Sequence, residues 1–197
     1  MKKVKSRNNI LISWLVIAAM VVIDQISKVW AATYLKTNGP ISWIDNVFEL
    51  HYLENQSAAF GVDLIQILQK LFRISYFETH PDVFLQVKMV AFVVLTFAVV
   101  VLLYLLYLRI PAEKKFRYLD WILIAFIAGA IGNMIDRAAH QYVIDFFYFK
   151  LINFPIFNVA DIYVTVSAFA LIVLGLFYYK EEDYDRIFPP KNKKKSV

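Results

Sequence analysis

The aspartates that lie inside or beside apolar stretches of this sequence include Asp24, Asp136, Asp145 and Asp161. Ionisable residues in such stretches are costly to place and are usually functional. Lys28 follows Asp24 by one helical turn, and Arg137 follows Asp136 directly. A neighbouring cation favours the ionised carboxylate, so these two aspartates are expected to have supporting or binding roles.

Asp145 and Asp161 have no Lys, Arg or His within four residues. Asp145 lies in the apolar run Val143–Phe147, a setting that should raise the pKa of its carboxyl. Two such carboxyls that meet in space share one proton and titrate as a pair. One can then act as a base toward water while the other donates to a carbonyl oxygen. The two residues predict a water-activating aspartate dyad.

Other reaction chemistries have weaker support in the sequence. The chain has no cysteine, which excludes disulfides, thiolate metal sites and a cysteine nucleophile. His51, His80 and His140 are not in a zinc-binding spacing, and there is no glycine-rich phosphate loop. Ser57 and Ser167 have no obvious base partner in the sequence. We therefore expect neither a metal nor another cofactor.

The composition indicates that the elements holding these residues lie in a membrane. Of the 197 residues, 60% are hydrophobic and 19% are charged, whereas soluble domains are about half apolar and a quarter charged. The net charge of +5 comes from Lys and Arg at the chain ends and between apolar stretches. This placement indicates membrane topology rather than nucleic-acid binding.

Four segments approach the ~20 apolar residues that a membrane helix needs: Ile10–Ala32, Val83–Leu108, Arg117–Ala139 and Val159–Tyr179. Lys and Arg concentrate in both tails and in the loop between spans two and three, which predicts that both termini are cytoplasmic. Asp24 and Lys28 interrupt the first span before any cleavage site, so we expect it to be retained rather than removed as a signal peptide.

This topology brings the polar residues of three spans and one loop to the outer end of the spans. Asp24 lies about 21 Å outward along the first span, and Asn133 and Asp136 lie about 24–29 Å outward along the third. Span four runs inward, so Asn158 and Asp161 stand at its outer start, with Asp145 in the short outer loop before it. The spacing predicts one polar site near the external interface; a buried structural network is the alternative.

Residues 38–82 form a long outer segment between spans one and two. Val47–Leu53 mixes β-branched, aromatic and alternating polar residues, as a strand does. Apolar residues from Leu64 to Ser75 recur at helical spacing, which predicts an amphipathic helix on the bilayer or over the site, or a packed connector. We expect residues 1–180 to form one domain, followed by a charged, disordered cytoplasmic tail at 181–197.

Five motifs in this order resemble those of lipoprotein signal peptidase, the signal peptidase II family of bacterial aspartic membrane proteases. They are Asp24–Lys28 (DQISK), Asn55–Gly61 (NQSAAFG), Gly132–Arg137 (GNMIDR), Val143–Phe146 (VIDF) and Phe157–Asp161 (FNVAD). The resemblance covers roughly residues 10–180. It implies an all-α polytopic membrane protein with four transmembrane helices and a small extracytoplasmic β-cradle, to which the sequence adds the amphipathic outer helix.

The resemblance also implies a function and a site. Asp145 and Asp161 would form the catalytic dyad of an endopeptidase in the bacterial cytoplasmic membrane, near its outer face. Its substrate would be a prolipoprotein cleaved N-terminal to a diacylglyceryl-modified cysteine, with no metal. Binding roles fall to Asn55, Asn133, Arg137 and Asn158, and supporting roles to Asp24, Lys28 and Asp136. We expect a monomer whose only other partner is membrane lipid.

Some features depart from the family, and two other functions stay open. Ser57 stands where the family usually has glycine, the segment 63–82 is longer than expected, and the charged tail is an extension. A small proton-coupled transporter could use the same aspartates as a relay, although no internal repeat is visible. A metal-dependent membrane hydrolase could use Asp and Asn oxygens as ligands.

Overall fold

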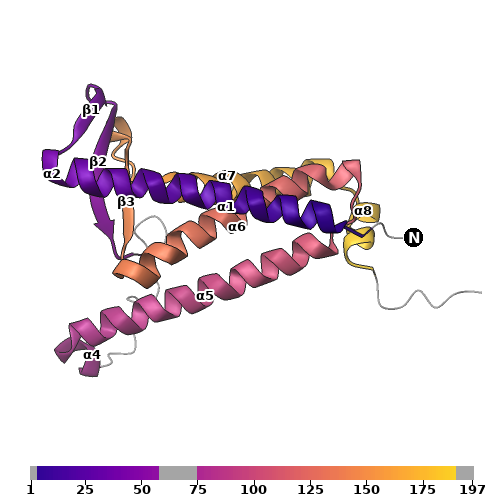
Figure 1. Ribbon diagram of the computed structural model, residues 1–197, viewed down its shortest axis with the longest axis horizontal. Coiled ribbons are helices and arrows are strands. Elements are labelled where there is room, and N and C mark those ends of the chain that lie inside the picture. Colours follow the sequence, from indigo (N-terminus) through magenta and orange to yellow (C-terminus); the bar gives the residue numbers. More distant parts are fainter. Residues whose placement is uncertain (1–3, 58–74, 190–197) are drawn as a thin grey trace, which may run out of the picture.

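A computed structural model describes residues 4–57 and 75–189 of the chain. Four helical segments long and apolar enough to cross a membrane run side by side (Figure 1). They are α1 (Arg7–Trp30), continued by η1 (Ala31–Leu35) and α2 (Lys36–Asn38); α5 (Pro81–Arg109); α6 (Arg117–His140); and α7 (Val159–Val173), continued by η4 (Leu174–Tyr178). They confirm the four spans predicted from the sequence, with ends that differ by a few residues.

Helix α6 lies at the centre of the bundle and packs against α1, α5 and α7. Two glycines allow its close approach to neighbours. A Cβ on Gly129 would lie 2.5 Å from the Ala160 carbonyl oxygen, and one on Gly132 would lie 2.5 Å from Asp24 Oδ2. The missing side chains therefore let α7 and the polar face of α1 reach α6, which brings their buried polar groups within hydrogen-bond distance.

A three-stranded antiparallel sheet lies at one end of the bundle, in the order β1 (Ile41–Ile44), β2 (Phe48–Asn55) and β3 (Val143–Tyr148) (Figure 1). The strand expected at Val47–Leu53 is confirmed as part of β2. The expectation that Asp145 lies in a loop is wrong, because it lies in β3, opposite Leu53 of β2. Pairing with β2 satisfies the backbone of this short, largely buried segment.

The shorter helices lie at both ends of the bundle. At the end opposite the sheet, η2 (Lys114–Phe116) joins α5 to α6, and α8 (Glu181–Ile187) packs beside it through ion pairs of Asp183 with Lys115 and Arg186 with Glu113. The prediction of a disordered tail is therefore wrong over residues 181–187, because these contacts hold them in a helix. At the other end, α4 (Ser75–Thr79) packs against the start of α5, and η3 (Lys150–Ile152) follows β3 and contacts β2. Apart from Ser75, the amphipathic helix predicted at 64–75 falls outside the described residues.

Candidate active site

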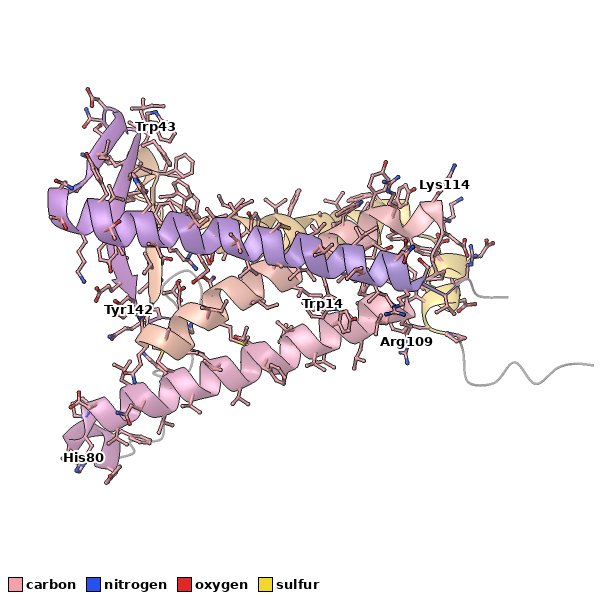
Figure 2. All side chains as sticks on the ribbon, in the orientation of Figure 1. Trp14, Trp43, His80, Arg109, Lys114 and Tyr142 are labelled. Carbon is pink, nitrogen blue, oxygen red and sulfur yellow. The ribbon has the colours of Figure 1, made fainter. Side chains whose placement is uncertain are left out.

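Asp145 and Asp161 line one cavity of about 400 Å³ where the sheet meets the helices. β3 supplies Asp145, and the first turn of α7 supplies Asp161. Three further residues predicted for the site, Asn55, Asn133 and Arg137, also line this cavity. In Figure 2 the labelled Tyr142 marks the point beside the site where α6 ends and the chain turns toward β3.

The Asp145 carboxylate is held from both sides by asparagine side chains. Asn55 donates to its Oδ2 at 2.8 Å, and Asn158 donates to its Oδ1 at 2.6 Å. The residue is only 1% exposed. Burial, together with the nearby charge of Asp161, raises the pKa of Asp145 to about 7, although the two asparagine hydrogen bonds act in the opposite direction. Asp145 can thus hold or release a proton near neutral pH.

Asp161 is fixed by the way α7 begins. Asn158 is the N-cap of this helix: its Oδ1 accepts from Asp161 N at 2.9 Å, while its own backbone N donates to Asp161 Oδ2 at 3.1 Å. This reciprocal pair is a capping box. Asn133 donates to the remaining oxygen, Asp161 Oδ1, at 2.8 Å. All four carboxyl oxygens of Asp145 and Asp161 therefore accept a hydrogen bond from an N–H donor.

Asn158 joins the two aspartates, since its side chain binds Asp145 and its backbone binds Asp161. Its side-chain nitrogen also donates to Asn133 Oδ1 at 3.1 Å and to the Ile144 carbonyl at 3.2 Å. The residue is fully buried. We expected it to line the site and hold the substrate, but it lies behind the cavity wall and holds the carboxyl groups.

A second polar cluster lies behind the first, around the buried Lys28. Its Nζ is 2.9 Å from both Asp24 Oδ2 and Asp136 Oδ2. The sequence suggested Arg137 as the cation beside Asp136; the ion pair is with Lys28 instead, because α1 crosses α6 at this level. Lys28 also donates to Asn133 Oδ1 at 3.0 Å, which links this cluster to the hydrogen bonds of the cavity aspartates.

The two aspartates of this cluster position the backbone next to the cavity aspartates. Asp136 Oδ2 accepts from the backbone N of Ile144, the residue before Asp145, at 3.2 Å. Asp24 Oδ1 accepts from the backbone N of Ala160, the residue before Asp161, at 2.9 Å. Each supporting carboxylate thus fixes one of the two elements that carry the pair.

Gln25 is a member of the site that the sequence reasoning missed. Its Nε2 lies 2.9 Å from Asp136 Oδ1, 3.1 Å from Asp24 Oδ2 and 3.2 Å from the Gly132 carbonyl. It stands between Asp24 and Lys28 in the first motif, which is the signal that could have identified it. Its amide shares Asp24 Oδ2 with Lys28 and also donates to Asp136 Oδ1, whereas Lys28 pairs with Asp136 Oδ2.

Arg137 forms part of the cavity wall on the α6 side. Its guanidinium donates to the Ser57 carbonyl at 3.3 Å and to the Asn133 carbonyl at 3.5 Å. It also lies over the ring of Phe92 in α5, 5.3 Å from the centroid. Arg137 therefore connects α5 and α6 to the end of β2 and places a cation at the cavity.

Apart from Thr165, the rest of the described cavity wall is apolar, which the sequence reasoning did not predict. The apolar residues come from β3, from the segment between β3 and α7, and from α7: Val143, Phe149, Ile152, Phe154, Pro155, Ile156, Phe157, Ile162, Val164 and Val166. The apolar run 151–157, broken by Asn153, was the available signal. Within residues 4–57 and 75–189, no group of three or more His, Asp or Glu side chains is arranged to hold a metal ion.

Comparisons with known proteins agree on one family. Residues 16–177 match the family model described as signal peptidase (SPase) II. The chain is 32% identical to a lipoprotein signal peptidase of Clostridium tetani, over 87% of this chain and 94% of that protein. It is 36% identical to a lipoprotein signal peptidase of Clostridioides difficile, over 83% of this chain and 94% of that protein.

Solved structures share the fold. A bacterial membrane enzyme determined by the in meso method at 2.3 Å resolution superposes with a TM-score of 0.65 at 24% identity, covering 89% of this chain and 92% of that one. A second, at 1.9 Å resolution, gives a TM-score of 0.64 over 91% and 99% of the two chains. With the family model matching most of its length, the chain belongs to the signal peptidase II family.

Proposed function

We propose that this protein removes the signal peptide of prolipoproteins, with Asp145 and Asp161 as its catalytic dyad. The family match and the names of the relatives support the reaction. The observation that carries the dyad is the shared cavity, in which two carboxyls from separate elements have every oxygen held by an N–H donor. Such fixed geometry lowers the reorganisation needed during reaction.

The raised pKa of Asp145 suggests how the pair divides its work. At neutral pH the pair shares one proton, and Asp145, with a pKa of about 7, holds it. Asp161 then takes a proton from water, whose oxygen attacks the scissile carbonyl, while Asp145 donates its proton to the carbonyl oxygen. When the tetrahedral intermediate collapses, the C–N bond breaks and Asp161 passes its proton to the departing amine. Asp145 recovers the proton from the hydroxyl, and the dyad returns to its starting state.

The substrate follows from the family and fits the position of the site. We infer that the cysteine after the scissile bond carries a diacylglyceryl group, which keeps that bond at the edge of the membrane. The cavity stands where α7 begins and the sheet ends, at one end of the four apolar helices. At this level the site can bind the scissile bond and water can still enter it. A site deeper in the hydrocarbon would lack that water.

The membrane orientation is also part of the proposal. The Lys and Arg of both tails support termini on the cytoplasmic side, and we infer that the sheet and cavity lie at the outer face of the cytoplasmic membrane. Asn55, Asn133 and Asn158 position the dyad, and Arg137 offers its guanidinium to a substrate carbonyl. Asp24, Lys28 and Asp136 hold β3 and α7 in place. We expect a monomer to suffice because one chain supplies all of these groups.

Substitution of either aspartate tests the dyad. Asp145→Asn and Asp161→Asn should each abolish cleavage of a lipid-modified precursor while the protein still inserts and folds. Asp45→Asn is the matched control, since Asp45 lies on the exposed turn between β1 and β2 and its carboxylate accepts from Ser42 at 2.7 Å. Full cleavage by either dyad variant would refute the assignment.

The two other functions considered from the sequence lead to different measurements. The comparisons give a transporter no support. A transporter would move protons across the membrane even when no peptide substrate is present. A metal-dependent hydrolase would lose cleavage in a strong chelator and regain it with added divalent ion. We expect cleavage by this protein to continue in the chelator, because the dyad itself activates the water.

A further inference from the structure

The cavity has two chemically different ends. The two aspartates form the polar end together with Asn55, Asn133 and Arg137, while an apolar end is formed by Phe149, Ile152, Ile162 and Val166. These apolar residues are also exposed: Ile152 is 67% exposed and Val166 is 61% exposed. The apolar end is therefore not an enclosed pocket, because the same side chains lie on the outer surface of the protein.

That surface continues along the lipid-facing side of α7. Ile162, Val166 and Phe169 follow one another at helical spacing on one stripe, and all three are exposed. In a helix that spans the membrane, exposed apolar side chains contact lipid. The apolar end of the cavity is thus continuous with the lipid-facing surface of α7, and a chain in the bilayer can reach the cavity from the side.

The opposite wall of this opening is held in a defined shape. Tyr148 donates to Asn153 Oδ1 at 2.8 Å, and Asn153 has the left-handed backbone conformation (φ 47°) that asparagine tolerates. The Leu151 backbone N donates to the Val47 carbonyl at 3.3 Å, which ties the loop to the β1–β2 hairpin. The ring of Phe149 packs 4.9 Å from that of Phe48. These contacts fix the wall before any ligand arrives.

The β1–β2 hairpin extends beyond the bundle and exposes apolar side chains. In Figure 1 β1 and the start of β2 project from the sheet end of the helices, on the side away from α5. Trp43, labelled in Figure 2, lies near the tip, and it is exposed together with Ile44 and Leu151. Tryptophan favours the membrane interface. The exposed Trp43, Ile44 and Leu151 are therefore suited to contact the membrane interface.

We propose that the opening between α7 and the 149–157 loop binds the acyl chains of the substrate's diacylglyceryl group. This acyl groove, defined by Phe149, Ile152, Ile162 and Val166, rests on the proposed function. The scissile bond must reach the dyad, so the lipid on the adjacent cysteine starts at the edge of the cavity. Its chains then have an apolar, lipid-continuous path along α7, whereas the opposite end of the cavity is polar.

The groove should position the substrate more than it strengthens binding. Lipid tails are as apolar as the groove, so moving an acyl chain from bilayer to groove gains little hydrophobic free energy. The gain comes from van der Waals contacts with a preformed wall, and it grows with the length of chain in contact. The groove therefore predicts a preference for long acyl chains over short ones.

The test compares two lipopeptide substrates, with paired hexadecanoyl or paired butanoyl chains, in detergent micelles. Val166→Trp should fill the groove and reduce the ratio of kcat/KM for the long over the short substrate about tenfold, equivalent to about 1.4 kcal/mol. Val94→Trp is the matched control: Val94 is 62% exposed on α5 and does not line the cavity. The control should leave the ratio unchanged; equal ratios in the two variants would overturn the groove.

Crosslinking provides a second measurement that does not depend on turnover. A photoreactive benzoylphenylalanine at position 166, in the Asp145→Asn background, should capture a radiolabelled acyl chain of the bound substrate, and the same group at position 94 should not. Capture of the signal peptide, or of labelled phospholipid as readily as substrate, would refute the acyl assignment. Failure of the wild-type protein to cleave either lipopeptide would instead refute the proposed function itself.

Discussion

Asn158→Asp tests the geometry of the site by exchanging one nitrogen for oxygen. Asn158 Nδ2 lies 2.6 Å from Asp145 Oδ1 and 3.1 Å from Asn133 Oδ1. It also lies 3.2 Å from the Ile144 carbonyl. The substitution turns this donor into an oxygen that faces three other oxygens. The oxygen that caps α7 is kept, and aspartate caps helices about as well as asparagine.

The expected effect is large on activity and small on folding. Two carboxylates about 4 Å apart repel by about 4 kcal/mol at an effective dielectric constant of about 20. That is equivalent to about three pK units, so the pKa of Asp145 should rise further above its value of about 7. The proton would then be held between residues 145 and 158 instead of within the dyad. Removing one preorganised donor from a reacting group typically costs about 100- to 1,000-fold in kcat.

The assay follows cleavage of a diacylglyceryl lipopeptide across the neutral pH range, with thermal unfolding measured on the same samples. We expect kcat to fall at least about 100-fold, while unmet hydrogen bonds lower stability by about 1–3 kcal/mol. The control is Asn46→Asp, at an exposed turn residue with φ of 60°, which should change neither quantity. If Asn158→Asp kept more than about a tenth of the wild-type kcat, the role of Asn158 in holding the dyad would be wrong.

Three further variants address proton binding and support. The pKa of Asp145 rises from 3.8 to about 7 on folding, so the folded state keeps a proton that the unfolded chain has lost. The free energy of unfolding should therefore fall by about 4 kcal/mol as pH rises from about 4 to about 7, and Asp145→Asn should flatten this dependence in denaturation measured against pH. Lys28→Met should cost about 3–5 kcal/mol, measured in the same way, because two buried carboxylates lose their cation. Gly132→Ala should cost about 1–3 kcal/mol, since its Cβ would lie 2.5 Å from Asp24 Oδ2; an unchanged unfolding midpoint would contradict this close packing.

The sequence predicted the helices better than the sheet. Length and hydropathy determine a membrane helix almost by themselves, because its backbone hydrogen bonds are internal. β3 was missed because its hydrogen bonds are made to β2, which lies far away in the sequence. Its residues Val143–Phe146 are all buried, so they show none of the apolar–polar alternation that identifies a half-exposed strand. Asp145 was consequently expected in a loop.

The sequence also predicted which residues meet, but not how they pair. Depth along each span and the motif order brought the polar groups to one level. The hydrogen-bond and ion-pair partners depend on how the helices cross. Asp136 forms its ion pair with Lys28 instead of Arg137, and Asn158 binds the two carboxyl groups. Helical spacing within one span contains no information on such crossings. The apolar end of the cavity was missed for a similar reason, since it joins a loop to one face of α7.

The charges of the two polar clusters explain why a shared proton suits this site. Among the residues that the structure describes, the cavity and its support contain four carboxyl groups, Asp24, Asp136, Asp145 and Asp161, and two cations, Lys28 and Arg137. With every group ionised the site would have two net negative charges, and burial makes such an excess costly. Lys28 already has two carboxylate partners, so it offers the dyad little compensation. One proton retained by the pair halves the excess, and it is also the proton that the proposed mechanism delivers to the scissile carbonyl. In the proposed mechanism the supporting cluster thus contributes to catalysis through its charge as well as its geometry.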